Sequence, residues 1–100
     1  MTKIGTAIRA ERTARGLTLT EISRGAGFSI PYVGDIEHGN RLPPHKTMLR
    51  IAAQLPDVSC AAWSWLLAED LFGAAAVEAM REHAALKLGE QWLRANESER

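Results

Sequence analysis

The sequence has a single cysteine, Cys60, in 100 residues. One cysteine excludes both an intrachain disulfide and a cysteine-based zinc site. The histidines His38, His45 and His83 have no metal-ligand spacing with Cys60 or with one another, so we expect no metal and no other cofactor. The sequence also lacks a phosphate-cradling glycine loop and any context for a nucleophile, and we therefore expect that the protein is not an enzyme.

Long apolar runs are absent as well. The longest, at residues 60–68, is too short to span a bilayer and contains Ser64. A signal peptide is not expected, because basic residues interrupt the N-terminal segment before an apolar run forms: Lys3, Arg9, Arg12 and Arg15. These absences predict a cytoplasmic protein with no membrane partner.

The chain has no net charge, since 12 Lys and Arg balance 12 Asp and Glu, but the charges are divided unevenly. Residues 1–50 contain eight basic and four acidic side chains, whereas residues 51–100 contain four basic and eight acidic ones. A basic half joined to an acidic half suggests that only the first half faces a polyanion. The alternative is chance variation in a small sample.

No segment alternates between apolar and polar residues as a strand does, and the turn residues are of the kind that start and stop helices. The fold class is therefore all-α. We expect helices at about residues 3–15, 18–26, 29–38 and 45–55, then one from residue 59 and one from about 74 to 95. Gly73 is expected to break or bend the chain between the last two.

Residues 18–39 have the pattern of two short helices joined by a tight turn. Thr18 and Glu21 stand three residues apart and form the sequence pattern of a capping box. Gly27 then suits the left-handed conformation that ends a helix, and Ser29 suits the N-cap of the next one. Two helices around a short turn with glycine predict a helix-turn-helix, whose second helix can lie in the DNA major groove.

Four segments within residues 4–55 match a known family in order and spacing: IRAERTARGLTLTEIS, AGFS, YVGDIEHGNRLPP and TMLRIAAQL. In these segments the chain resembles the lambda-repressor/Cro family of helix-turn-helix domains, often called the XRE family. The resemblance implies a five-helix lambda-repressor-like domain that binds double-stranded DNA, here with an added C-terminal helix. We expect the DNA-binding domain at residues 1–56 and a helical dimerisation element at residues 57–100.

The resemblance also implies roles for residues that hold the helices together. Glu37 matches the family's acid near the end of the recognition helix, and Arg12 matches its basic partner, so a partly buried ion pair is expected. Phe28, Val33 and Ile36 match core positions.

The outward face of the recognition helix is expected to meet base edges: Ser29, Ile30, Pro31, Tyr32 and Asp35. This set lacks Arg, Lys, Gln and Asn, the side chains that best read guanine or adenine. For Ile30 and Pro31, the alternative is a role in helix packing or N-terminal geometry. Leu19 and Gly34 depart from the family, in which Gln and Ser are common at those positions. Contact with the DNA backbone then falls to a second set of residues: Thr18, Thr20, Arg24, Asn40, Arg41 and Lys46.

The segment after Ser59 is apolar nearly all round until Glu69, so it must be covered on every side. The following segment has an apolar stripe at helical spacing. Together they predict a helix-against-helix dimer interface made by eight residues: Trp63, Leu66, Leu67, Phe72, Val77, Met80, Leu88 and Trp92. The alternative is that these helices fold back and enlarge the core of a monomer.

Three functional hypotheses follow. The first is a homodimeric, sequence-specific transcriptional regulator, a small repressor that binds a palindromic operator through the helix at 29–38. The second is the antitoxin of a toxin–antitoxin pair, which represses its own operon and binds a toxin through its C-terminal helices. The third is a protein-interaction module that has lost DNA binding, suggested by the unusual helix face of Ile30, Pro31 and Asp35.

Overall fold

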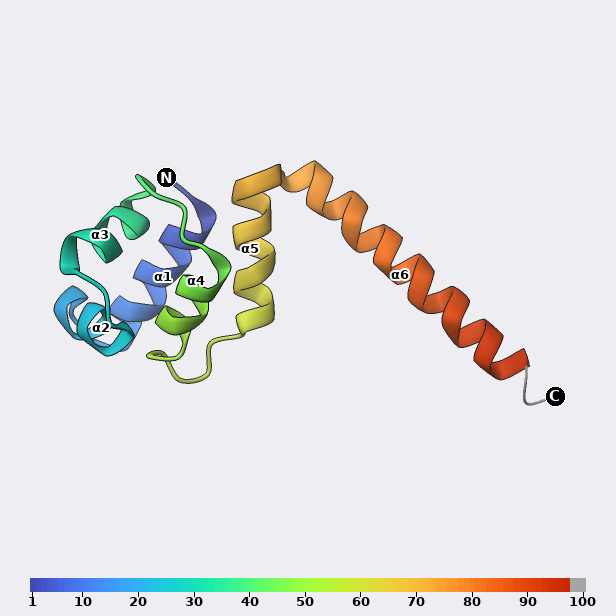
Figure 1. The fold of residues 1–100 in the computed structure, drawn as a ribbon, viewed down its shortest axis with the longest axis horizontal. Helices are drawn as coiled ribbons and strands as arrows, with labels where there is room; N and C mark the ends of the chain where they lie inside the picture. Colours follow the sequence, from blue (N-terminus) through green and yellow to red (C-terminus); the bar gives the residue numbers. More distant parts are fainter. Residues whose placement is uncertain (98–100) are drawn as a thin grey trace.

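The computed structural model describes residues 1–97, and within these residues all regular secondary structure is helical, as predicted. The helices in order are α1 (Lys3–Ala14), α2 (Leu19–Ala26), α3 (Ile30–His38), α4 (His45–Ala52), α5 (Cys60–Phe72) and α6 (Ala74–Glu97). Figure 1 shows α1 to α5 gathered into one body, from which α6 projects. The end of the predicted C-terminal element, residues 98–100, lies outside the described part of the chain.

Local capping determines where α2 and α3 begin and end, as the sequence predicts. The Thr18 hydroxyl accepts the Glu21 N–H at 3.1 Å, and the Glu21 carboxylate accepts the Thr18 N–H at 3.4 Å. Gly27 ends α2 with φ of 80°, a conformation that a side chain disfavours. The Ser29 hydroxyl accepts the Tyr32 N–H at 3.3 Å, which starts α3. The ends of the two helices in the motif are therefore set by hydrogen bonds and backbone conformations within a few residues.

Helix α4 is shorter than predicted, because it ends at Ala52 instead of about residue 55. The next residues form hydrogen bonds between positions three apart, as in a 3₁₀-helix. The Gln54 N–H donates to the Ile51 carbonyl and the Leu55 N–H to the Ala52 carbonyl, each at 3.0 Å. Pro56 follows, and a proline disfavours the helical conformation of the residue before it. The chain therefore tightens over its last turn instead of continuing the α-helix.

The core is built from all five helices of the body. Its buried apolar residues are Ile4 and Ile8 of α1, Ile22 and Ala26 of α2, Val33 and Ile36 of α3, Met48, Ile51 and Ala52 of α4, Leu55, and Trp63 and Leu67 of α5. Helix α5 packs on α1 and α4, so the core continues beyond the domain limit expected at residue 56. A helix that is apolar on all sides is most stable when several of its sides are buried. Much of the apolar surface of α5 is buried within a single chain.

The end of α5 also holds the start of α1. The Asp70 carboxylate accepts the backbone N–H groups of Lys3 and Ile4, both at 2.8 Å. The first N–H groups of a helix have no partner within it, so Asp70 caps α1 from a distant part of the sequence. Lys3 adds an ion pair with Glu69 at 2.9 Å.

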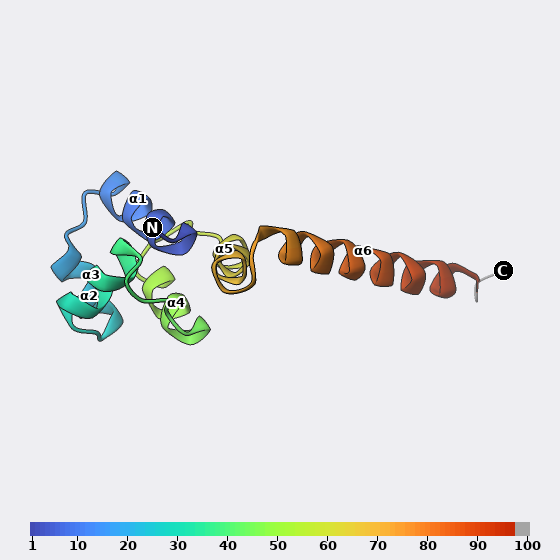
Figure 2. The same ribbon diagram turned by 90° about the horizontal axis from the view of Figure 1, so that it is seen from above.

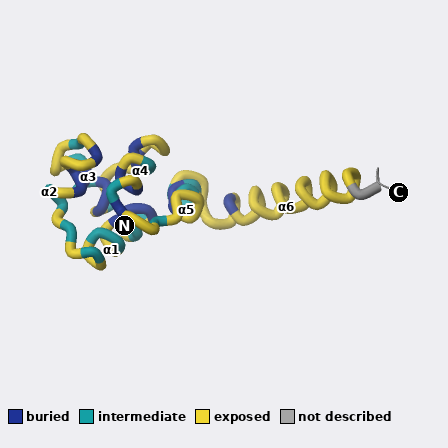
Figure 3. The backbone as a smooth tube through the Cα atoms, turned by 90° about the horizontal axis from the view of Figure 1, so that it is seen from below, coloured by how far each residue is buried: buried dark blue, intermediate teal, exposed yellow. Residues whose placement is uncertain are grey.

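Helix α6 leaves the body at Gly73, which breaks the helix as expected, with φ of 89°. Only Val77 near its start is buried, and the rest of its described side chains are exposed (Figure 3). The molecule measures 58 × 26 × 21 Å, and its radius of gyration is 17.3 Å. A compact chain of this length has a radius of about 13 Å, so α6 makes the molecule markedly elongated. None of the helices within residues 1–97 is both long and apolar enough to cross a membrane.

Candidate nucleic-acid interface

Helix α3 separates its residues cleanly between an inner and an outer face. Val33, Ile36 and Glu37 are buried, whereas Ser29, Ile30 and Pro31 are exposed. Tyr32 and Asp35 are half-buried. All five residues predicted to face bases therefore retain some contact with solvent. Figures 1 and 2 place α2 and α3 at the end of the body away from α6.

An ion pair fixes the inner face of α3 to α1. The Arg12 Nε and Nη2 groups donate to the two Glu37 carboxylate oxygens at 2.8 and 2.9 Å. The Arg12 Nη1 group donates to the Leu17 carbonyl at 2.9 Å, so the same guanidinium also holds the loop before α2. The side chain of Glu37 is only 2% exposed and that of Arg12 14%. This forked geometry holds α3 at a fixed angle against the body.

The hydrogen bonds with Glu37 raise the pKa of Arg12 above its ordinary value, against the opposing effect of burial. The contribution of the Arg12 charge to stability is therefore complete below the ordinary pKa of arginine, and it is lost as the pH climbs through the raised value. The guanidinium therefore stays charged throughout the neutral range.

Arg41, just after α3, folds back over the outer face of the helix. Its guanidinium carbon lies 5.7 Å from the centre of the Tyr32 ring, and its Nε lies 3.8 Å from the Asp35 carboxylate. The Asp35 carbonyl also accepts the Asn40 and Arg41 N–H groups at 2.8 and 3.3 Å. The structure thus brings Tyr32, Asp35, Asn40 and Arg41 together. Because the ion pair is exposed and long, it contributes little to stability, and Arg41 can leave it for another partner.

The other residues predicted to meet the DNA backbone are more scattered. Arg24 and Lys46 are exposed and form no ion pair within the described part of the chain. Thr20 is half-buried. The Thr18 hydroxyl both accepts the Glu21 N–H and donates to the Glu21 carboxylate at 3.0 Å, so a phosphate would compete with the cap for that hydroxyl.

The two departures from the family pattern lie against each other. A Cβ placed on Gly34 would be 3.4 Å from a terminal methyl carbon of Leu19. Leu19 itself packs against the core from its half-buried position. The apolar side chain of Leu19 therefore lies next to the space that a side chain at position 34 would occupy. The two departures from the family pattern are thus in contact with each other.

Phe28 packs against the core, as the resemblance implies, but from a half-buried position. The Arg50 guanidinium carbon lies 4.6 Å from its ring centre. The Phe28 and Tyr32 ring centres are 5.3 Å apart. Arg50 was not predicted from the sequence, because an exposed arginine in α4 carries no sequence signal of this long-range contact.

The predicted dimer interface needs correction at three of its eight residues. Trp63 and Leu67 belong to the core of a single chain, because α5 turns them toward α1 and α4. Val77 is buried where α6 leaves α5, so it too is covered within the chain. Leu66 is half-buried against the core. The remaining four predicted residues are exposed: Phe72, Met80, Leu88 and Trp92. Four large apolar residues of α5 and α6 that the prediction omitted are exposed as well: Trp65, Leu71, Leu86 and Leu93.

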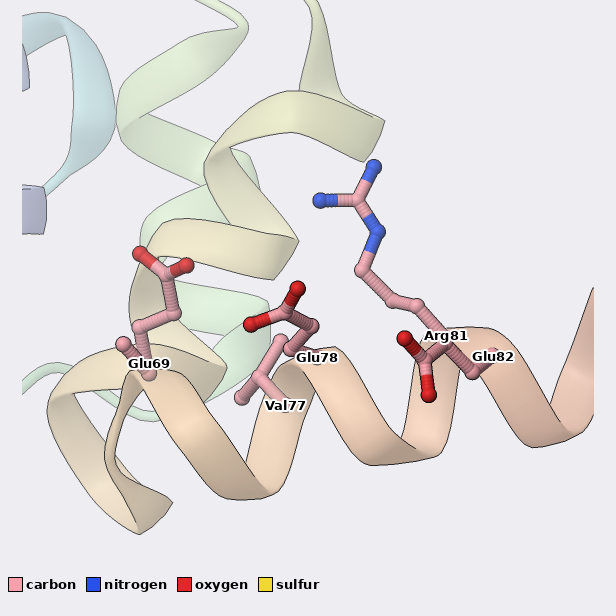
Figure 4. A pocket seen from close by; sticks show the side chains of 6 residues that line it. Glu69, Val77, Glu78, Arg81 and Glu82 are labelled. Carbon is pink, nitrogen blue, oxygen red and sulfur yellow. The ribbon is translucent and has the colours of Figure 1, made fainter.

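A small acidic hollow lies in the angle between α5 and α6. It is lined by Glu69, Glu78 and Glu82, and Arg81 extends from its rim toward α5 (Figure 4). The Arg81 guanidinium carbon lies 4.7 Å from the centre of the Trp65 ring. Among the residues that the structure describes, no group of three acidic, histidine or cysteine side chains could hold a metal ion. This end of the molecule has the wrong charge for a polyanion.

Two capped helices, a glycine turn between them and an ion-paired second helix define a protein of the helix-turn-helix class. The sequence profile of the helix-turn-helix family matches residues 8–63, and the chain belongs to this family in its lambda-repressor/Cro (XRE) form. The chain is similar to the ImmF control region 10 kDa protein of Bacillus phage phi105, with 42% identity over 50 residues. The match covers 50% of this chain and 56% of that relative, so the chain spans about half the length of the curated protein it matches. No solved structure matches the chain.

Proposed function

We propose that the protein is a homodimeric, sequence-specific transcriptional regulator, a small repressor that works in the cytoplasm by binding a palindromic operator and blocking a promoter. The observation that carries this proposal is that α3 has a buried inner face and an exposed outer face. Its inner face is fixed by the Arg12–Glu37 ion pair, while its outer face is left to solvent beside Arg41. A rigidly held helix with an exposed outer face is suited to enter the major groove.

On this proposal, the outer face of α3 reads bases mostly without hydrogen-bond donors. Ile30 and Pro31 offer apolar surface to thymine methyl groups, and Asp35 accepts from a cytosine amino group. Ser29 and Tyr32 lie at the edges of the same face. Register comes from contacts to the DNA backbone by the second predicted set: Thr18, Thr20, Arg24, Asn40, Arg41 and Lys46.

Dimerisation through α6 is the second part of the proposal. This helix of 24 residues is about 36 Å long and carries exposed apolar side chains, including Met80, Leu88 and Trp92. Pairing with a second copy would remove this surface from water. A two-fold dimer would also present two recognition helices to a palindrome whose half-sites lie about one DNA turn, or 34–36 Å, apart.

Selection of bound duplexes from a random pool tests DNA binding, symmetry and half-site spacing together. We expect enrichment of a palindrome, with an affinity that falls steeply as salt rises. Recovery of no preferred sequence, or binding that ignores salt, would overturn the DNA-binding part of the proposal.

The dimer requires its own experiment. Leu88→Glu places a charge on the proposed interface, and Ala79→Glu is a matched control because it lies about 180° around the same helix. Both positions are exposed in one chain, so neither change disturbs the core. Light scattering should show a dimer for the wild type and Ala79→Glu and a monomer for Leu88→Glu. A wild-type monomer, or equal behaviour of both variants, would contradict dimerisation through this face.

The exposed apolar side chains of Leu71 and Phe72, beside acidic residues, favour the antitoxin as a second candidate. In that case the C-terminal helices would cover a toxin instead of, or in addition to, a second copy. Co-expression with the neighbouring gene product distinguishes the two functions, since an antitoxin should co-purify with it in a fixed ratio.

A further inference from the structure

Arg50 belongs to α4, but its guanidinium lies against the turn that opens the recognition helix. Its Nη2 would be 2.6 Å from a Cβ placed on Gly27, and its guanidinium carbon is 4.6 Å from the centre of the Phe28 ring. Both neighbours are in the turn between α2 and α3. The absence of a side chain at Gly27 therefore gives the arginine room to lie on the aromatic ring.

Two arginines stand at the two ends of one aromatic pair. Arg50 covers Phe28, the Phe28 and Tyr32 rings are 5.3 Å apart, and the Arg41 guanidinium carbon lies 5.7 Å from the centre of the Tyr32 ring. Phe28 precedes the N-cap of α3, and Tyr32 lies in the first turn of the helix. The aromatic pair thus spans the start of α3, with one guanidinium against each ring.

Arg50 has no carboxylate partner in the part of the chain that the structure describes. Within the described residues, Arg50 forms no ion pair and donates no side-chain hydrogen bond, whereas Arg41 lies 3.8 Å from Asp35. A guanidinium that lies over an aromatic ring keeps its N–H donors for other partners. The contact with Phe28 therefore favours one position of the guanidinium, while its hydrogen-bonding capacity is unused.

We propose that Arg50 binds a phosphate of the DNA backbone, with Phe28 as the platform that positions it. This inference rests on the proposed function and adds a residue of α4 to the interface. Arg50 and Arg41 then bind backbone phosphates on either side of the start of α3. Two such arginines supply affinity to a recognition helix that has few donors of its own.

The competing explanation is that Arg50 only shields the Phe28 ring from water. The two roles differ in their response to salt, because binding a phosphate releases counterions and shielding releases none. The probe is a duplex that the wild-type protein selects from a random pool, and its affinity is measured over a series of salt concentrations. Arg50→Gln removes the charge. Arg9→Gln is the matched control, since Arg9 is an exposed arginine of α1 outside the interface.

We expect Arg50→Gln to weaken binding about tenfold and to lower the salt slope by about 0.9 for each phosphate that is no longer neutralised, or about 1.8 per dimer. Arg9→Gln should keep the wild-type slope. Arg50→Lys keeps the charge and should retain the slope, while binding more weakly than the wild type because it lacks the planar fork. Phe28→Leu should weaken binding in the wild type but have no further effect on binding when combined with Arg50→Gln.

Three results separate failure of this inference from failure of the proposed function. If no duplex is selected by the wild type, the proposed function fails and the inference falls with it. If Arg41→Gln lowers the slope but Arg50→Gln leaves it unchanged, DNA binding stands and the role of Arg50 is overturned. The same holds if Arg50→Gln lowers only the melting temperature, which would leave shielding as its role.

Discussion

The Arg12–Glu37 ion pair should show strong coupling between its two partners. Changing Arg12 to Met leaves the Glu37 carboxylate, only 2% exposed, without its guanidinium. The Leu17 carbonyl loses its donor in the same variant. Removing one partner of a buried pair costs about 3–5 kcal/mol, and Arg12→Met should lie near the upper end because it strands the more deeply buried charge.

The reverse change should cost less. In Glu37→Met the stranded guanidinium is 14% exposed and keeps its bond to the Leu17 carbonyl, so we expect a loss of about 3 kcal/mol. The double variant strands no charge. It should be destabilised by only about 1 kcal/mol, mainly through the unpaired Leu17 carbonyl, and should therefore be more stable than either single variant.

These differences are large against a total stability of about 5–15 kcal/mol, and Arg12→Met should lower the melting temperature by about 20 °C or more. Urea unfolding gives the free energies, followed by far-UV circular dichroism and by fluorescence that includes the buried Trp63. All variants must be compared at one protein concentration, because dimerisation would add to apparent stability. A cost below about 1 kcal/mol for either single change, or single costs that simply add in the double variant, would refute the coupling between the two side chains.

Two further predictions concern the N-terminal helix. Gly5→Ala should cost about 2–3 kcal/mol, because a Cβ there would overlap the carbonyl oxygen of Ile36, whereas Gly89→Ala meets nothing within 4 Å and should raise the helicity of α6; equal melting temperatures for these two variants would contradict the close α1–α3 contact. Asp70→Asn should cost about 1–2 kcal/mol because it weakens the cap on α1, and the change should appear in urea unfolding. Glu69→Gln removes only the exposed ion pair with Lys3 and should cost at most about 0.5 kcal/mol, so a similar loss in both variants would argue against the capping role.

The sequence was sufficient for features that depend on neighbouring residues. The ends of α2 and α3 are set by hydrogen bonds and backbone conformations within a few positions, at Thr18 and Glu21, at Gly27 and at Ser29. The end of α4 was harder to predict, since Pro56 marks where a helix must stop but not how far ahead the last turn tightens.

Contacts between distant residues were only partly predictable. The apolar character of α5 showed that its faces must be covered, but it could not distinguish a second copy from the chain's own α1 and α4. Trp63 and Leu67 were therefore assigned to the wrong neighbour. The contact of Arg50 with Phe28 and the cap formed by Asp70 join residues that no local pattern relates. Such contacts depend on how the helices pack against one another, and local sequence patterns do not specify this packing.

The fold places much of the acidic excess of the second half away from α2 and α3. Part of the acidic excess, Glu69 and Asp70, is held at the start of α1, where carboxylates stabilise the positive end of a helix. Other acidic residues, such as Glu78 and Glu82, lie at the start of α6, on the far side of the body from α2 and α3 (Figure 1). On the proposed function, phosphates approaching α3 would meet Arg41 and Arg50, and repulsion from α6 would be weakened by distance and by salt. The same repulsion disfavours any docking of DNA on the α6 side, so the charge pattern would orient the protein as well as attract it.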